Sequence, residues 1–425
     1  MKVYLDMVGC RLNQSEIESF AQQFEARGHT LTGDPGQADL AVVNTCTVTV
    51  AAAADSRKKI RRFARKGAKE VIATGCWATL EPERAQELSG VSAVIPNAQK
   101  DDLVSHILDI EPEVFDQEPL EREMIPGARL RTRAFIKAQD GCDHRCTFCI
   151  TTLARGKSTS IHIPDILDQV RAAERGGAQE VVLTGVQLGS WGHDLDEDLG
   201  LHHVLQAILE ETDVPRVRLS SIEPWDVEPP LIRLLTDDRV ARQLHLPLQS
   251  GSADTLQRMA RMITPQEYAA LVDQIRAVDP EIAITTDIMV GFPGETQETF
   301  QESLHFVQEM RFADAHIFTY SKREGTTAAR LPDQVDHPLR KERHARMDEV
   351  VTASAHRYRK SFVGREMDVL WESVTRMEDQ RWKMSGLTDN YLRVRATADR
   401  DLWNQITTVE LTELTDRGLK GTPAV

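Results

Sequence analysis

The sequence lacks the long apolar runs that a membrane-spanning helix needs. Hydrophobic residues make up 41% of the 425-residue chain, yet no apolar stretch approaches the roughly 20 residues required to cross a bilayer. The first residues, MKVYLDMVGCRLNQ, reach charged side chains at Asp6 and Arg11, so they also lack the apolar core of a secretion signal. We therefore expect a soluble protein in the cytoplasm.

Cysteine and positive charge are both scarce. The chain has six cysteines, and in a large chain without a secretion signal these are more often metal ligands, catalytic groups or buried thiols than disulfides. The formal net charge of −15 argues weakly against nucleic acid as a partner, because phosphate contacts need Lys and Arg.

One stretch departs from the acidic balance. SRKKIRRFARKG carries only basic charges from Arg57 to Lys66. A solvated helix face and a nucleic-acid contact both remain open for it.

The length predicts more than one domain, because a single hydrophobic core stops growing well below 425 residues. Residues 1–110 alternate short apolar runs with amphipathic stretches, which is typical of a parallel α/β domain. We expect helices from Ser15 to Arg27 and from Asp55 to Lys66. The expected strands are KVYLDMV, DLAVVNT, KEVIATG and SAVIP.

Three of these strands lead into cysteine, at Cys10, Cys46 and Cys76. In an open parallel sheet, the residues beyond the carboxyl ends of the strands lie along one edge, where ligands bind. The three thiols are therefore expected to converge. Three separately buried thiols are the alternative.

A charged segment with several prolines, DIEPEVFDQEPLEREMIPGARLRTR, reads as an interdomain linker. Over residues 128–358 the alternation resumes, which predicts a parallel partial barrel with its site at the strand carboxyl ends. Its expected strands are AFIKAQ, EVVLTGV, RVRLSS, QLHLPLQ, AITTDIMVG and DAHIFTYS. After a long charged helix, residues 359–418 change to short alternating segments with turns at Gly386 and Asn390, which predicts a small antiparallel β-barrel.

The stretch GCDHRCTFC places Cys142, Cys146 and Cys149 in a tight loop with no fourth cysteine nearby. Four cysteines close a zinc site or saturate a four-iron cluster, whereas three leave one metal position open for a substrate. A zinc site would need a fourth ligand such as His144, which lies between two of the cysteines with awkward geometry. Phe148 is expected to cover the cluster or an adenine ring, with ordinary loop packing as the alternative.

GCDHRCTFC resembles the CxxxCxxC loop of radical S-adenosylmethionine enzymes, in which the amino and carboxylate groups of that cofactor chelate the fourth iron. LTGVQLG, with Gly185 and Gln187, resembles the segment that receives the methionine amino group in that superfamily. TTDIMVGFPGET, with Gly291, resembles the strand and loop that flank the adenosine. For the glycines, turn geometry alone is the alternative. Further candidate cofactor contacts, with satisfied rim or solvent-facing polar groups as the alternative, are Ser221, Glu223, Gln249, Arg258 and Arg261.

From end to end the chain resembles the methylthiotransferases, in particular the branch that modifies threonylcarbamoyladenosine in tRNA beside the anticodon. The resemblance rests on GCRLNQSE, NTCTVT, DGCDHRCTFCI, RLSSIEP, LHLPLQSGS, VGFPGET and YSKREGT. GLTDNYLRV resembles the RNA-binding TRAM barrel of that family.

The resemblance implies two [4Fe-4S] clusters and S-adenosylmethionine. On the catalytic residues Cys142, Cys146 and Cys149, the first cluster would cleave the cofactor to a deoxyadenosyl radical that removes the hydrogen from adenine C2. On Cys10, Cys46 and Cys76, the second would present the methylated sulfur. The implied partners are a tRNA anticodon stem-loop and a reductant such as flavodoxin or ferredoxin.

Other interpretations remain open. The same chemistry serves an isopentenyl-type adenosine or a ribosomal-protein aspartate, and a non-catalytic iron–sulfur RNA-binding protein is a different class. For the threonylcarbamoyl carboxylate, the candidate cations are Arg155, Lys322 and Arg323, with phosphate contact or solvation as the alternative.

Overall fold

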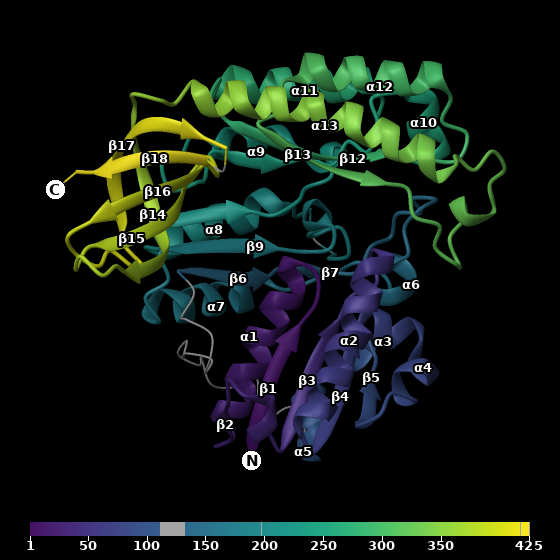
Figure 1. The fold of residues 1–425 in the computed structure, drawn as a ribbon, viewed down its shortest axis with the longest axis vertical. Helices are drawn as coiled ribbons and strands as arrows, with labels where there is room; N and C mark the ends of the chain where they lie inside the picture. The colour runs from purple at the N-terminus through teal and green to yellow at the C-terminus, as the bar shows by residue number, and fades with distance from the viewer. Residues whose placement is uncertain (111–131, 197, 417, 425) are drawn as a thin grey trace.

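The structure is a computed structural model that describes residues 1–110, 132–196, 198–416 and 418–424. Figure 1 shows an N-terminal α/β part, a larger central α/β part and a small C-terminal β-barrel. The α/β fold class predicted from the sequence is thereby confirmed. The predicted linker lies almost entirely outside the described residues. In the part of the chain that is described, no helix combines the length and apolar character needed to cross a bilayer.

The N-terminal part is a five-stranded sheet in the order β2-β1-β3-β4-β5, and all its strand pairs are parallel. Helices cover both faces, so β3 is buried along its whole length. The predicted strands are present, and the short β2 is an addition. The strands are β1 (Lys2–Met7), β2 (Thr30–Leu31), β3 (Leu40–Thr45), β4 (Glu70–Gly75) and β5 (Val91–Ile95). The helices are α1 (Arg11–Ala26), α2 (Val50–Lys66), α3 (Cys76–Leu80), α4 (Pro82–Gln86) and α5 (Leu103–Leu108).

The central part carries the six predicted parallel strands in chain order. They form two three-stranded sheets, β10-β9-β6 and β11-β12-β13, which an isolated parallel bridge between Ser221 and His245 joins. The result is the open partial barrel that the alternation predicts. The strands are β6 (Arg133–Lys137), β9 (Glu180–Thr184), β10 (Arg216–Leu219), β11 (Gln243–His245), β12 (Ala283–Val290) and β13 (Asp314–Thr319).

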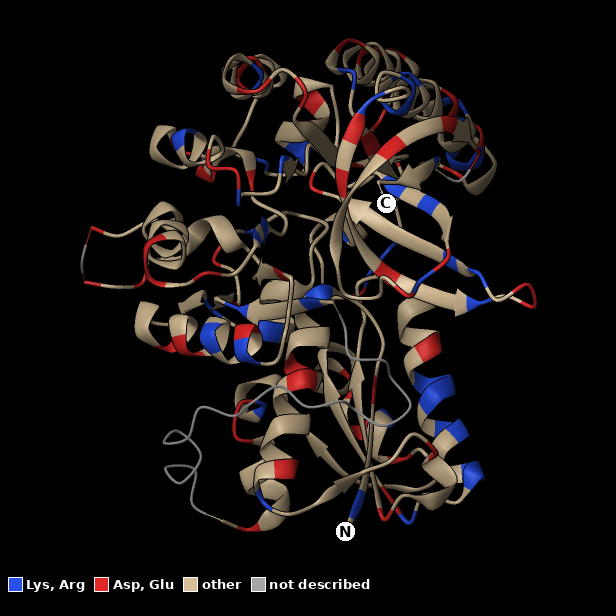
Figure 2. Ribbon diagram, turned by 90° about the vertical axis from the view of Figure 1, so that its left-hand side faces the viewer, with Lys and Arg blue, Asp and Glu red and all other residues tan. Residues whose placement is uncertain are grey.

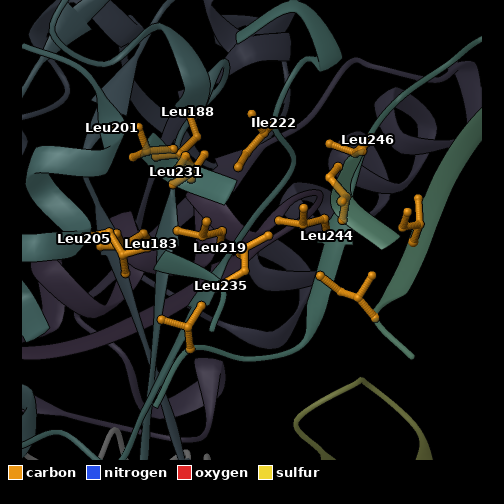
Figure 3. Close-up of a cluster of buried hydrophobic side chains, with 14 of the residues drawn as sticks. Leu183, Leu188, Leu201, Leu205, Leu219, Ile222, Leu231, Leu235, Leu244 and Leu246 are labelled. Atoms are coloured by element: carbon orange, nitrogen blue, oxygen red, sulfur yellow. The ribbon is translucent and has the colours of Figure 1, made fainter. Parts of the chain in front are cut away.

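Leucines pack between the strands of this partial barrel and the helices that cover its outside. Figure 3 shows Leu183 of β9, Leu219 of β10 and Leu244 of β11 in the cluster that also holds Leu201 and Leu205 of α8. This core holds the strands rigidly, so that their carboxyl ends can carry a site. The main helices are α7 (Ile163–Arg175), α8 (Leu201–Glu211), α9 (Pro229–Leu234), α10 (Ala253–Arg258), α11 (Pro265–Val278), α12 (Gln297–Met310) and α13 (His337–Lys360).

The C-terminal part is a closed barrel in the order β14-β15-β16-β18-β17. Its neighbours pair antiparallel, except that β16 and β18 are parallel. The turn predicted at Gly386 is wrong, because Gly386 lies inside β15, where an added Cβ would stand 2.3 Å from the backbone oxygen of Leu370. The last strand was not predicted. The strands are β14 (Glu366–Arg376), β15 (Trp382–Thr388), β16 (Arg393–Ala398), β17 (Ile406–Thr415) and β18 (Gly418–Pro423).

Candidate active site

The N-terminal triad, which we define as Cys10, Cys46 and Cys76, lies at the carboxyl edge of the first sheet. Cys10 follows β1, Cys46 follows β3, and Cys76 begins α3 directly after β4. The Cys10 and Cys76 thiols both act electrostatically on the Cys46 thiol. The structure thus brings together the three thiols that the strand pattern places at one edge.

Two glycines set the sharp turns that aim these thiols. Gly9 has a φ of +118°, and a Cβ there would stand 2.9 Å from the Cys46 sulfur. Gly75 has a φ of +91°, and its Cβ would stand 2.4 Å from the backbone oxygen of Thr45. Only glycine fits both the backbone conformation and the space, so Cys10 and Cys76 leave their strands toward Cys46.

Two asparagines that the sequence analysis missed touch this triad. The Asn13 amide donates to the backbone oxygens of Val8 (2.7 Å) and Thr45 (3.3 Å), and its Oδ1 lies 3.7 Å from the Cys10 sulfur. Asn97, in the 3-10 turn η2 (Asn97–Gln99), places its Nδ2 3.7 Å from the Cys76 sulfur. Asn13 begins a run of buried polar residues on α1 that extends to Glu16.

The barrel triad, which we define as Cys142, Cys146 and Cys149, lies in the loop between β7 (Gln139–Asp140) and α6 (Thr151–Arg155). Its thiols act electrostatically on one another. The loop is anchored to the end of α10, because Thr147 donates its backbone N–H to Met259 (3.0 Å) and its hydroxyl to the backbone oxygen of Arg258 (2.9 Å).

All six cysteines are free thiols, and burial opposes the ionisation of three of them. Burial raises the pKa of Cys142 to about 12, and it also raises the pKa of Cys46 and of Cys146. Buried thiols of this kind become thiolates when a metal supplies compensating positive charge.

Three soft thiolate donors in each triad fit an iron–sulfur cluster with one open iron. Among the residues that the structure describes, no three His, Cys, Asp or Glu side chains converge closely enough to hold a single metal ion. A four-iron cluster instead takes each thiolate on a different iron. His144, the alternative zinc ligand, accepts a hydrogen bond at Nε2 from the Trp225 indole (3.2 Å).

Several predicted cofactor residues contact the barrel triad. The Cys142 thiol donates to Gln187 Oε1 (3.0 Å), and the Gln187 amide donates to Asp226 (3.1 Å). Arg261 lies 3.9 Å from the Cys146 sulfur and makes two hydrogen bonds to Glu223, at 3.0 and 2.6 Å. Arg261 therefore does not face solvent. Its charge is balanced by Glu223.

In the described part of the chain, the remaining predicted contacts form no hydrogen bond to the triad thiols. Gly185 packs against Gln139, where an added Cβ would stand 2.8 Å from the amide oxygen. Ser221 bridges to β11, and Gln249 adopts a φ of +75° beside β12. Gly291 has a φ of +72° and donates its N–H to the Glu295 carboxylate (2.8 Å).

Phe148 packs against Met259, Phe292 and Tyr320 on the barrel side. Its ring lies edge-on to that of Phe292, with 6.5 Å between centroids. This is ordinary loop packing, and contact with a cofactor stays a prediction.

Among the candidate cations, Arg155 is buried and paired with carboxylates of the protein. Its side chain is 3% exposed and donates to Asp140 (2.9 and 3.0 Å), Glu16 (3.0 Å) and Asn13 (2.8 Å). Glu16 and Asp140 already balance its charge, and a role in binding a substrate carboxylate stays a prediction.

Arg323 differs from Arg155. Its Nε and Nη2 are buried, and neither has a hydrogen-bond partner among the described residues. Cys46 and Glu81 are the acidic groups that act on it. Lys322, by contrast, is exposed.

The basic run lies on α2, which begins just beyond the N-terminal triad. In Figure 2, the blue of Lys and Arg covers the lower turns of this helix, which runs down the lower right of the view. Arg57 stacks over Trp77, 5.6 Å from the ring centroid, and Lys59 pairs with Asp6 at 2.7 Å. The exposed cations of the helix are Lys58, Arg61, Arg62, Arg65 and Lys66.

Comparison with known proteins agrees with this arrangement. The sequence model of the uncharacterized protein family UPF0004 matches residues 2–96, and that of the Radical SAM superfamily matches residues 136–307. The chain resembles the solved structure of the radical S-adenosylmethionine methyltransferase TsrM from Kitasatospora setae, with a TM-score of 0.56 over 75% of this chain and 74% of that one. At 15% identity, this likeness shows the fold alone.

Curated relatives match over nearly the whole chain. The Thermotoga maritima threonylcarbamoyladenosine tRNA methylthiotransferase MtaB is 37% identical over 87% of this chain and 86% of its own length. The Bacillus subtilis protein of the same name is 33% identical over 95% and 92%. The tRNA-2-methylthio-N(6)-dimethylallyladenosine synthase of Staphylococcus haemolyticus is 30% identical over 97% and 83%. A radical S-adenosylmethionine barrel and full-length matches of this kind identify the chain as a member of the tRNA methylthiotransferase family, whose superfamily uses a [4Fe-4S] cluster and S-adenosylmethionine.

Proposed function

We propose that this chain is the transferase that adds a methylthio group to C2 of N6-threonylcarbamoyladenosine next to the anticodon of tRNA, giving 2-methylthio-N6-threonylcarbamoyladenosine. We further propose that each cysteine triad holds one [4Fe-4S] cluster. The observation that carries the proposal is that all six thiols fall into two triads at strand carboxyl ends, one in each α/β part. Two clusters allow one to generate the radical and the other to present sulfur.

The residues beside the barrel triad hold the cysteine loop and orient the reacting groups. When bound, the cluster with S-adenosylmethionine supplies the one-electron chemistry that removes a hydrogen atom from carbon. Gln187 fixes the Cys142 side of the loop. The buried Arg261–Glu223 pair fixes the Cys146 side and brings no net charge to the site. These contacts hold the reacting groups in one geometry, which is the contribution that the protein makes in cofactor-dependent catalysis.

Arg323 is the cation we assign to the threonylcarbamoyl carboxylate. Two of its guanidinium nitrogens are buried without a partner in the described part of the chain, so a carboxylate arriving beside the N-terminal triad would satisfy them. Arg323→Gln should lower turnover on the carboxylate-bearing RNA by about 10- to 150-fold, the value of a charged hydrogen bond. Lys322→Gln is the matched control and should change turnover little, because Lys322 is exposed.

A tRNA anticodon loop suits the site because a base modified at C2 must leave its stack, and a loop base does so at little cost. The exposed cations of α2 are the candidate phosphate contacts. A reductant such as flavodoxin or ferredoxin and a cytoplasmic location complete the proposal.

Two other acceptors, an isopentenyl-type adenosine and a ribosomal-protein aspartate, use the same chemistry. Relatives named for threonylcarbamoyladenosine reach 37% identity, against 31% for a synthase named for dimethylallyladenosine, which supports threonylcarbamoyladenosine as the acceptor. A non-catalytic iron–sulfur RNA-binding protein would have no reason to cleave S-adenosylmethionine reductively.

The test compares three anticodon stem-loop RNAs with the reconstituted enzyme, bearing threonylcarbamoyladenosine, isopentenyladenosine or unmodified adenosine. We expect methylthiolation of the first and poor turnover of the other two. Equal turnover of all three, or activity on the isopentenyl form alone, would end the assignment. Absence of deoxyadenosine in every arm would point to the binding protein.

A further inference from the structure

The two cysteine triads are joined by a short connection of hydrogen bonds through α6. This helix begins two residues after Cys149 and ends at Arg155. The N-terminal part forms hydrogen bonds to it at two places. The connection crosses between segments far apart in the sequence, since Arg155 and Asn13 are separated by 142 positions.

The first hydrogen bond is to the helix backbone. Asn97 donates its side-chain amide to the backbone oxygen of Ala154 at 2.7 Å, and the same nitrogen lies 3.7 Å from the Cys76 sulfur. One side chain thus touches both a ligand of the N-terminal triad and the helix that carries the barrel triad.

The second contact is made by the Arg155 guanidinium. Nη1 donates to Asp140, whose Oδ1 also accepts the backbone N–H of Gly141 (2.7 Å), the residue before Cys142. Nη2 donates to Asn13 Oδ1 (2.8 Å), the atom that lies beside the Cys10 sulfur. Through Arg155, the backbone entering one triad is therefore linked to a side chain that touches the other.

Burial makes this connection rigid. The side chains of Arg155 and Glu16 are 3% and 2% exposed, and Lys100, which also pairs with Glu16, is 2% exposed. A second ion pair between the two parts, Lys137 with Asp101 (2.5 Å), lies at the end of β6, but its Asp101 side chain is exposed, so the rigidity rests on the Arg155–Glu16–Lys100 cluster. Ion pairs with full hydrogen bonding and little water hold a single geometry.

We infer that Arg155, Asn13 and Asn97 are positioning residues that fix the separation and orientation of the two cysteine triads. The inference rests on the proposed function, because the reaction needs groups held at the two triads to reach the same adenine carbon. A planar guanidinium is required, since its donors engage Asp140, Glu16 and Asn13 at once, which a lysine ammonium at the same place cannot reproduce.

The test uses Arg155→Lys and Asn97→Ala in the full-length reconstituted protein, with Arg175→Lys, an exposed arginine at the end of α7, as the matched control. For each protein, iron content, deoxyadenosine and methylthiolated RNA are measured. We expect unchanged iron, deoxyadenosine within about threefold of wild type, and at least tenfold less methylthiolated product per deoxyadenosine. The control should keep the wild-type ratio.

Two measurements stand apart from turnover. Hydrogen exchange of the α6 and α1 amides in the cluster-free protein should accelerate in both variants and not in Arg175→Lys. In the loaded variants, the electron paramagnetic resonance splitting that arises from the magnetic interaction between the two reduced clusters should be broader or weaker than in wild type. An unchanged product ratio, or iron and both products falling together, would overturn the inference. If wild type itself makes no methylthiolated RNA, the proposed function fails, while the exchange measurement still decides whether the connection is rigid.

Discussion

Replacing Glu16 by glutamine tests the buried charge cluster that joins the two α/β parts. The Glu16 carboxylate accepts from Lys100 (2.5 Å), Arg155 (3.0 Å) and Asn44 (2.7 Å). Glutamine keeps the shape and leaves two buried cations with less compensation. Breaking a buried pair on one side costs about 3–5 kcal/mol. At about 2–4 °C per kcal/mol for a cooperative unit of this size, the unfolding midpoint should fall by about 6–20 °C.

The pH dependence carries its own sign. Burial opposes ionisation of Glu16, yet Lys100 and Arg155 hold its pKa well below the ordinary 4.5. A lowered carboxyl pKa contributes stability that is complete above pH 4.5 and is lost as the pH falls below that value. The Glu16 carboxyl itself therefore adds no pH dependence to the difference between wild type and Glu16→Gln from about pH 6 to about pH 8.

The assay is calorimetry of the cluster-free protein across that pH range. The control is Glu83→Gln, an exposed carboxylate in the same part of the chain, which should shift the midpoint by no more than about 2 °C. A Glu16→Gln midpoint as close to wild type as the control would refute the reasoning.

Three further predictions concern the clusters and the RNA. Reconstituted wild type should hold about eight irons per chain and Cys46→Ala about four; unchanged iron in Cys46→Ala would remove the N-terminal triad from the mechanism. Cys146→Ala should abolish deoxyadenosine formation, whereas Cys76→Ala should retain it and lose sulfur insertion; a normal deoxyadenosine rate in Cys146→Ala contradicts the division of labour. Neutralising four exposed cations of α2 should weaken tRNA binding and reduce its salt slope by up to about four units, while neutralising exposed cations of α13 should not; an unchanged slope returns α2 to a solvated face. The four are Lys58, Arg61, Arg62 and Arg65.

Local pattern was enough to predict the strands and the cysteines at their ends. β3 begins with the apolar run LAVV and is buried along its whole length, and Cys46 follows it directly, so the position of the thiol follows from the strand alone. The same holds for Gln187 and Glu223, which lie just beyond the ends of β9 and β10.

Contacts between distant segments were not predictable in this way. Arg155 looks like a free cation in the sequence, and only the packing of α1 against β6 brings Glu16 and Asn13 to it. Asn97 sits in a short turn without periodicity, so nothing local indicates that it reaches Cys76. At Gly386 the local pattern predicts a turn, whereas the barrel needs a glycine there so that two backbones can approach closely.

Nucleoside mass spectrometry of tRNA from a strain lacking this protein tests the central claim most directly. The account predicts that 2-methylthio-N6-threonylcarbamoyladenosine disappears, that N6-threonylcarbamoyladenosine accumulates in its place, and that the wild-type gene, but not one encoding Cys146→Ala, restores the product. Unchanged 2-methylthio-N6-threonylcarbamoyladenosine, or loss of only the methylthio isopentenyl nucleoside, would contradict it.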